Sequence, residues 1–227
     1  MHPGAIPQDI LDRCMARRGR IHTFETIDPR RSAMVIVDMQ DAFVAENAIA
    51  EIPMAREIVP NINRLNKVLR DAGGMVVWIV STYGPRQEDR WPIMYDHIFD
   101  PSLGNQVRAA LSEGDSGHSI YSKLETKAED HTINKNRFSA FVGSDGQLEH
   151  LLRSNNIDTI LITGTVTSVC CESTAREGAM RNFKTFMISD ANAGRDDDEH
   201  WASLSNILLG FGDVYTTDEM IDLIKDK

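Results

Sequence analysis

The sequence predicts an α/β protein in which helices cover both faces of a central parallel sheet, giving three α-β-α layers. Short, continuous apolar runs rich in Val, Ile and Leu stand at residues 33–37, 75–80 and 158–163. Such runs are typical of strands buried on both faces. Segments with helical spacing of apolar residues separate them, which is the pattern of a parallel sheet. With 41% hydrophobic residues among 227 and no linker rich in Pro, Gly or Ser, a single domain over residues 32–227 is expected.

The first part of the chain supplies a strand–helix–strand unit after an N-terminal arm. Residues 1–31 mix Pro, Arg and Ile without a clean period, so this arm is expected to lie across a neighbour or across its own domain. Residues 55–72 have an amphipathic helical pattern that ends at a Gly-Gly pair, between the first two strands. From 81 to 130 the chain is polar and interrupted by Pro and Gly. Long excursions of this kind are often lids or substrate loops.

The second part of the chain continues the alternation of strands and helices. A weak strand at 131–134 leads into Lys135, and Ser144 is expected to cap a helix that runs to residue 155. The strand at 158–163 is followed by a helix that ends near residue 181. The remaining expected elements are a strand at 184–189, a helix at 196–209, a strand at 213–216 and a final helix, for which TTDE at 216–219 resembles a capping box.

Composition and charge exclude several classes of protein. The net charge of −10 disfavours binding to the phosphates of nucleic acid. No apolar run is long enough to span a bilayer, and the N-terminus lacks the apolar core of a signal peptide, so a soluble, cytoplasmic protein with no membrane partner is expected. Three cysteines, two of them adjacent, do not make a disulfide framework. Cys14, in the arm, is expected to be inert.

Three reactive side chains fall at the carboxyl ends of predicted strands, where parallel sheets collect their ligands. Asp38 closes the first strand, Lys135 ends the third, and Cys170 follows the fourth on the first turn of a helix that Thr167 or Ser168 is expected to cap. Unpaired N–H groups and the helix dipole favour a thiolate there, with a pKa below the usual value of about 8.5. Each residue also has an ordinary interpretation, because Asp often ends strands, Lys is commonly solvated and free Cys is commonly buried.

An acid, an amine and a thiol at one sheet edge supply the parts of covalent acyl transfer. In this hypothesis Asp38 accepts the Cys170 proton and returns it to a leaving nitrogen, while Lys135 supplies a fixed positive charge. Attack of the sulfur on an amide carbon gives a thioester, which water then hydrolyses. Backbone N–H groups of the turn at 164–170 are expected to stabilise the oxygen of the tetrahedral intermediate.

Three segments carry a resemblance to a known family. They read VIVDMQDAF at 35–43, KNRFSAF at 135–141 and GTVTSVCCESTA at 164–175. In order and spacing they resemble the signature segments of the isochorismatase-like cysteine hydrolases, and the resemblance covers roughly residues 29–224. The family pattern Gly-x-x-Thr-x-x-Cys selects Cys170. Cys171 is then expected to be a packing residue, because adjacent helix positions point about 100° apart.

This resemblance implies a specific architecture and a specific site. It implies a central six-stranded parallel sheet with helices on both faces, and a catalytic triad of Asp38, Lys135 and Cys170. It also implies a cis peptide bond between Thr165 and Val166, and an oxyanion hole formed by the backbone N–H groups of Val166 and Cys170. Cis peptide bonds outside proline are rare, so this is a sharp geometric expectation.

The resemblance also bears on the substrate. Nicotinamidases of the family carry Asp and His metal ligands after the second strand, where this chain reads STYG at 81–84, so no metal and no other cofactor is expected. Isochorismatases that cleave a vinyl ether do so without the cysteine, so its presence favours amide hydrolysis. The third segment and the RFSAF run look most like ureidoacrylate amidohydrolases and other enzymes acting on carbamoyl or ureido groups. The candidate substrate-binding residues are Phe43, Tyr83, Trp91, Arg137 and Glu172, with Tyr95 as a further entrance aromatic.

The leading hypothesis is therefore a metal-independent cysteine amidohydrolase of a small linear amide. One alternative is a non-catalytic metabolite-binding module on the same fold, and another is a hydrolase of the nicotinamidase or isochorismatase type. A nucleotide-binding role is disfavoured because the sequence has no Gly-rich phosphate loop. The resemblance further implies a homodimer or homotetramer, with residues 1–31 as a candidate clasp.

Overall fold

The computed structural model describes residues 1–84 and 89–225, and within them six strands form one sheet. The strands are β1 (Ser32–Val37), β2 (Met75–Ser81), β3 (His131–Lys135), β4 (Thr159–Thr165), β5 (Lys184–Ala193) and β6 (Asp213–Tyr215). Their order across the sheet is β3-β2-β1-β4-β5-β6, and every neighbouring pair is parallel. The predicted α/β class and the six-stranded parallel sheet are confirmed.

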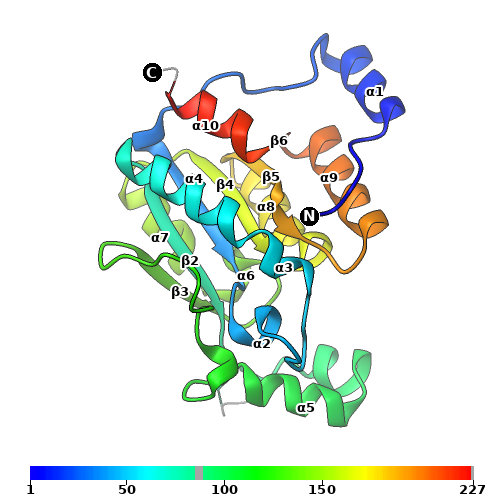
Figure 1. Cartoon of the computed structure of the whole chain (residues 1–227), viewed down its shortest axis with the longest axis vertical. Helices are drawn as coiled ribbons and strands as arrows, with labels where there is room; N and C mark the ends of the chain where they lie inside the picture. The colour runs from blue at the N-terminus through cyan, green and yellow to red at the C-terminus, as the bar shows by residue number, and fades with distance from the viewer. Residues whose placement is uncertain (85–88, 226–227) are drawn as a thin grey trace.

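Helices cover both faces of this sheet (Figure 1). One face carries α3 (Met54–Glu57), α4 (Val59–Asp71) and α10 (Thr217–Lys225), and the other carries α6 (Ala140–Gly143), α7 (Gln147–Ser154), α8 (Glu172–Met180) and α9 (Asp197–Gly210). Alternate strand residues enter two separate cores: Met34 and Ile36 of β1 face the first, and Val35 and Val37 face the second. Among the helices that the structure describes, none is both long and apolar enough to cross a membrane.

The excursion between β2 and β3 forms a lobe with its own apolar cluster. It contains a π-helical turn (Ile93–Ile98), helix α5 (Pro101–Ala110) and a 3-10 turn (Ser116–His118), against which α2 (Asp41–Val44) packs. Figure 1 shows α5 at the end of the molecule that is remote from both termini. Helix α5 was not expected from the polar composition. The signal for it was Asp100, whose carboxylate caps the helix, followed by Pro101 at its first position.

The N-terminal arm lies on its own domain. It contains helix α1 (Gln8–Arg18), which packs against α9, and a 3-10 turn (Pro29–Arg31) that leads into β1. Cys14 is 1% exposed, and its sulfur lies 3.9 Å from Leu208 O. Arg17 and Arg18 donate hydrogen bonds to carbonyl groups at the end of α9. Cys14 is the one fully buried residue of α1. The apolar stripe of this helix is therefore too narrow to be recognised in the sequence.

Local chemistry explains where helices begin. The pattern expected as one helix over 55–72 is divided into α3 and α4, since Pro60 in the first turn of α4 has no N–H to donate. The capping box before α10 is confirmed. Thr216 Oγ1 accepts a hydrogen bond from Glu219 N at 3.3 Å, and the Glu219 carboxylate accepts one from Thr216 N at 2.7 Å.

The start of α7 differs from the prediction. Ser144 does not stand at the cap position, which Gly146 occupies with a left-handed φ of 78°. The Ser144 hydroxyl nevertheless accepts a hydrogen bond from Leu148 N at 3.2 Å. Ser144 therefore satisfies one free N–H of the first turn from two residues further back.

Candidate active site

The candidate site lies at the carboxyl ends of β1, β2, β3 and β4. Asp38 directly follows β1, and Ser81 and Lys135 are the last residues of β2 and β3 and partners in the sheet register. Val37 of β1 is paired with Gly164 of β4, just before the cysteine turn. Because parallel strands end at one edge of the sheet, strand pairing alone gathers side chains from four distant segments.

Lys135 stands at the centre of a buried polar cluster. Its Nζ lies 2.8 Å from Asp38 Oδ2 and 3.6 Å from Cys170 Sγ. The ammonium also donates hydrogen bonds to Ser81 Oγ at 2.8 Å and to Arg137 O at 3.1 Å. Ser81 Oγ in turn donates to Asp38 Oδ1 at 2.9 Å. The structure thus brings Asp38, Lys135 and Cys170 together and adds a serine between two of them.

Neither Ser81 nor Gln40 was expected from the sequence as a site residue. The Gln40 side chain accepts a hydrogen bond from Ser81 N at 2.7 Å and donates to Ser81 O at 3.1 Å and His118 O at 3.0 Å. It therefore fixes the end of β2 against the segment after β1. The sequence did contain a signal for these two residues, because each is a polar residue at or just after the end of an apolar run. A polar side chain buried at the end of a strand needs hydrogen-bond partners.

Backbone conformation shapes this edge of the sheet. Asp38 has a φ of 53°, in the left-handed region that few residues with a side chain adopt. Gly164 has a φ of 110°, and a Cβ atom at this position would lie 2.1 Å from Val37 O. Only glycine therefore allows β4 to approach β1 this closely. The peptide bond between Thr165 and Val166 is cis.

The cysteine lies in a π-helical turn (Thr167–Cys171) that precedes α8. Val166 O accepts hydrogen bonds from the N–H groups of Val169, at 3.1 Å, and Cys171, at 3.2 Å. Cys171 is 0% exposed with its sulfur 3.9 Å from a carbonyl of β4, so it is a packing residue as predicted. Cys170 is the thiol that faces the polar cluster.

The expected helix cap at Thr167 or Ser168 is wrong. Val166 occupies the cap position of the turn. The two hydroxyls instead bond to α9, where Thr167 Oγ1 lies 2.9 Å from His200 Nδ1 and Ser168 Oγ donates to Glu199 at 3.3 Å. A neighbouring helix therefore takes the hydrogen bonds that the sequence assigns to a cap.

Burial dominates the electrostatics of the site. Asp38, Lys135 and Cys170 are 1%, 2% and 7% exposed. Burial raises the pKa of the Cys170 thiol, and the Asp38 carboxylate raises it further against the opposing effect of the Lys135 ammonium. For Lys135, burial lowers the pKa, but Asp38 and Cys170 raise it above its usual value. The expectation of a lowered thiol pKa is therefore wrong for the resting site, because loss of water outweighs the turn dipole.

The two oxygens of the Asp38 carboxylate differ in their hydrogen bonding, and we call the one without a hydrogen bond among the residues that the structure describes, Oδ2, the open oxygen. Oδ1 accepts the hydrogen bond from Ser81, whereas Oδ2 contacts the Lys135 ammonium as an ion pair and accepts no well-aligned hydrogen bond from the described residues. In addition to burial, the charge of this carboxylate raises the pKa of the Cys170 thiol. This arrangement can pass the thiol proton to Asp38 while Lys135 balances the negative charge.

Aromatic side chains of the lobe lie beside the site. The rings of Tyr83 and Tyr95 meet edge to face, with their centres 5.1 Å apart. Burial raises the pKa of both phenols, so both are neutral. Trp91 packs edge-on against Phe138 at 4.6 Å, and the Arg137 guanidinium lies 5.2 Å from the Trp91 ring centre. These residues form an aromatic wall next to the strand ends.

Two other candidates have structural roles that the geometry shows directly. Phe43 is half-buried between the first core and the cluster of the lobe. Glu172 forms an ion pair with Arg176 along α8 at 2.6 Å. Substrate binding by either residue stays a prediction. Within residues 1–84 and 89–225, no three His, Cys, Asp or Glu side chains are grouped as metal ligands.

A cavity of about 860 Å³ opens beside the site. Tyr83 and Lys135 line it on the side of the strand ends, and Asn105 and Arg108 of α5 line the lobe side. Cys170 is not among the described residues that line it.

Comparisons with known proteins bear on the family to which this chain belongs. The isochorismatase domain family matches residues 32–219. Enterobactin synthase component B of Escherichia coli K12 is 29% identical over 197 residues, which are 86% of this chain and 64% of that protein, so the chain spans less than two thirds of this relative. Ureidoacrylate amidohydrolase RutB of Caulobacter vibrioides is 29% identical over 208 residues, covering 84% of this chain and 90% of the relative.

A solved structure gives the same result. The crystal structure of a cysteine hydrolase from Pseudomonas syringae pv. phaseolicola 1448A has a TM-score of 0.79 and 30% sequence identity to this chain, covering 88% of this chain and 95% of the other. The family resemblance expected from the three sequence segments is confirmed. With a domain match over most of its length and the fold of its relatives, the chain belongs to the isochorismatase family of hydrolases.

Proposed function

We propose that this chain is a metal-independent cysteine amidohydrolase that cleaves a C–N bond of a small linear amide, such as a carbamoyl or ureido compound. The observation that carries the proposal is the buried contact of one ammonium with a carboxylate at 2.8 Å and a thiol at 3.6 Å. Burying charged groups costs several kcal/mol even when they are paired, so such clusters occur most often where chemistry needs them.

The first half-reaction forms a thioester. Asp38 takes the proton of the Cys170 thiol, and the sulfur attacks the carbonyl carbon of the amide. The C–N bond breaks as Asp38 returns the proton to the leaving nitrogen, which departs as ammonia or an amine. Lys135 stays charged throughout and offsets the negative charge that moves between the carboxylate and the sulfur. A raised thiol pKa suits this sequence, because the proton leaves only when an electrophile is in place.

The second half-reaction releases the acid. Asp38 removes a proton from water, the hydroxide oxygen attacks the thioester carbon, and the C–S bond breaks as the proton returns to Cys170. With a carbamoyl compound the acyl group is a carbamoyl group, and the product is carbamate. The carboxylate acts as base and then acid in both halves, so one residue serves four proton transfers.

The cysteine turn supplies the oxyanion hole in this proposal. The N–H groups of Val166 and Cys170 are the proposed donors to the developing oxyanion. Supporting this assignment, the turn after the cis bond is held closed by the two hydrogen bonds that Val166 O accepts. Removing one donor of this kind costs about 2.7–4 kcal/mol in comparable enzymes.

The substrate class is inferred from the wall of the site and from a relative. Trp91 and Tyr83 offer apolar surface, and Arg137 offers a positive charge beside the Trp91 ring, which together suit a short amide that also carries a carboxylate. The similarity to ureidoacrylate amidohydrolase RutB supports a ureido acid as the first choice.

A substrate panel with paired cysteine variants tests the proposal. Ammonia release would be measured with ureido acids, carbamoyl amino acids and simple amides. The variant Cys170→Ala is expected to lose about 10⁴-fold or more in turnover, because no nucleophile remains. Its matched control is Cys171→Ala, which alters the neighbouring packing thiol and is expected to retain most activity. Equal activity of wild type and Cys170→Ala on every hydrolysed amide would contradict the mechanism.

The competing function is a metabolite-binding module on the same fold. It is favoured by the low exposure of Cys170, 7%, and by its absence from the described lining of the cavity. Intact-mass measurements separate the two functions, because a hydrolase accumulates an acyl adduct on Cys170 during turnover and a binding module does not. The homodimer or homotetramer, the cytoplasmic location and the nicotinamidase or isochorismatase alternatives stay predictions.

A further inference from the structure

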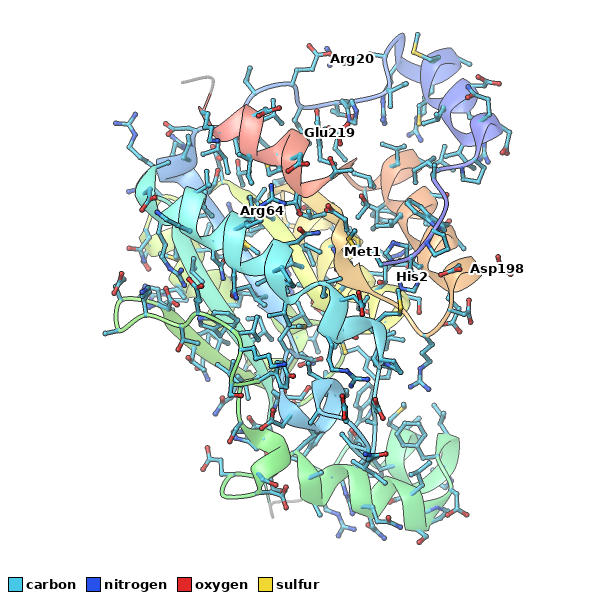
Figure 2. The ribbon with its side chains drawn as sticks, viewed as in Figure 1. Met1, His2, Arg20, Arg64, Asp198 and Glu219 are labelled. Carbon is cyan, nitrogen blue, oxygen red and sulfur yellow. The ribbon has the colours of Figure 1, made fainter. Side chains whose placement is uncertain are left out.

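One side chain near the start of the N-terminal arm, that of His2, is buried against α9. The His2 side chain is 3% exposed, and its Nε2 accepts a hydrogen bond from Gly194 N at 2.9 Å. Because Nε2 is the acceptor, the proton of the neutral ring is on Nδ1, which lies 2.6 Å from Asp197 Oδ1. Trp201 Nε1 donates to Pro3 O at 2.9 Å. Figure 2 shows His2 beside α9, at the end of the arm.

His2 is stacked on a second buried histidine. The ring centres of His2 and His200 are 4.1 Å apart, with 19° between the ring planes. His200 is 0% exposed, and burial is the main cause that lowers its pKa to about 3, with His2 lowering it further. It is therefore neutral at physiological pH. The Nδ1 atom of His200 lies 2.9 Å from Thr167 Oγ1. Stacking on His2 holds the plane of the His200 ring, and so it also holds the direction of this hydrogen bond.

Thr167 is the first residue of the cysteine turn. It is 0% exposed and lies directly after Val166, which follows the cis bond. Its carbonyl accepts a hydrogen bond from Ser203 Oγ of α9 at 3.3 Å. The hydroxyl and the carbonyl group of Thr167 therefore both contact α9. A shift of Thr167 would move the backbone that carries Cys170, three residues further on.

We propose that His2, acting through His200 and Thr167, is a positioning residue for Cys170. The N-terminal arm, which lies before the family match at residues 32–219, would then contribute to catalysis and not only to the attachment of α1. This inference rests on the proposed function, in which Cys170 is the nucleophile. Misplacement of reacting groups by about 1 Å can cost about 10²-fold in rate, so a loosened turn has a measurable effect.

Kinetics of two single variants and their combination test the coupling. His2→Ala removes the stack, and Thr167→Val removes the hydroxyl while keeping the shape. Each is expected to lower kcat by about tenfold with KM changed by less than about twofold, because the turn but not the substrate pocket is disturbed. The double variant is expected to be no slower than Thr167→Val, since both changes break one chain of contacts. Thr167→Ser keeps a hydroxyl and is expected to restore kcat.

Matched controls exclude a merely structural effect. Gln8→Ala changes an exposed residue of the same arm, whose hydrogen bond to Asp12 is solvent-exposed, and is expected to leave kcat unchanged. His2→Phe keeps an aromatic ring for the stack and is used if His2→Ala lowers the melting temperature. A fall in melting temperature with unchanged kcat, or additive effects of His2→Ala and Thr167→Val, would overturn the proposal.

Alkylation of Cys170 separates failure of this inference from failure of the proposed function. Iodoacetamide labelling, followed by intact mass with Cys170→Ala as background, needs no substrate. We expect His2→Ala and Thr167→Val to accelerate labelling by about threefold or more, because a looser turn exposes the sulfur more often. Wild type that labels normally but hydrolyses no amide would refute the function alone. Labelling rates that equal the wild-type rate in both variants would refute the positioning role of His2 and leave the proposed function standing.

Discussion

The two sides of β4 hold the reactive cysteine in different ways. On the β1–β3 side, Asp38, Ser81 and Lys135 meet through contacts of 2.8–2.9 Å between charged or strongly polar groups. On the β5 side, α9 holds Thr167 through a neutral histidine that is itself stacked on the arm. In the proposed mechanism, the first side controls the protons and charges, and the second side controls the position of the Cys170 sulfur. Changes on the first side should therefore abolish chemistry, whereas changes on the second should weaken it by degrees.

The largest effect is expected from Asp38→Asn. An amide in this position cannot accept the thiol proton, so kcat should fall by about 10²–10⁴-fold. The shape of the side chain is kept, but the buried Lys135 ammonium loses its paired charge, so the melting temperature should fall as well. Steady-state kinetics and a thermal melt of the same sample measure both. A loss of only a few fold would mean that the β1–β3 side does not control the protons, and the contrast between the two sides would disappear.

Ser81→Ala is expected to have the next largest effect. It leaves Asp38 Oδ1 without its hydrogen bond and takes one acceptor from the Lys135 ammonium. Buried groups that lose a partner cost about 1–3 kcal/mol, so a fall in kcat of about tenfold or more is expected. Ser81→Thr keeps the hydroxyl as a matched control. The pH profile of kcat should also differ between the two variants. Ser81→Thr keeps a hydroxyl that can donate to Asp38 Oδ1 and leave Oδ2 to accept the proton, whereas Ser81→Ala does not.

The two sides should lose stability at opposite ends of the pH scale. The pKa of Cys170 is raised from 9.0, so its contribution is present below pH 9 and lost as pH rises above it, with Lys135 adding the same sign above 10.5. The pKa of His200 is lowered from 6.5 to about 3, so its contribution is present above pH 6.5 and lost below. The buried Cys171 thiol, whose pKa is also raised, adds to the loss at alkaline pH. Melting temperatures from pH 4 to 10.5 should therefore fall less steeply at the alkaline end in Cys170→Ala, and less steeply at the acid end in His200→Gln.

The smallest effect is expected from Glu172→Gln. Its ion pair with Arg176 joins two residues one turn apart on α8, and pairs at this spacing on a helix contribute about 0.3–0.5 kcal/mol. We expect kcat and KM to stay within about twofold of wild type. A large rise in KM would instead show that Glu172 binds substrate, as the sequence suggested, and would place a binding residue on α8.

Residues that sit in a strong pattern were predictable. Continuous apolar runs identified the strands, and the topology of parallel sheets then placed Asp38, Lys135 and Cys170 at one edge without knowledge of any contact. Ser81 was missed because a serine at a strand end has no distinctive spacing. The direction of the Cys170 pKa shift was missed because the first turn of a helix indicates a dipole, whereas the extent of burial depends on everything packed around it.

Contacts between remote segments were beyond the sequence pattern. His2 and His200 are separated by 197 intervening positions, and neither has a periodic neighbour that indicates the other. Helix α1 buries one residue, Cys14, and so it has almost no amphipathic signal. The hydroxyl of Thr167 looked like a helix cap because a cap and a side-chain contact to another helix need the same residue type.

The raised pKa of Cys170 has a consequence for the life of the protein between turnovers. Peroxides and other oxidants attack the thiolate, and a sulfur kept protonated and almost covered by neighbours is a slow target for them. In the proposed mechanism, the thiolate forms only while a substrate occupies the site. The Cys170 thiol of the resting protein is therefore expected to oxidise slowly.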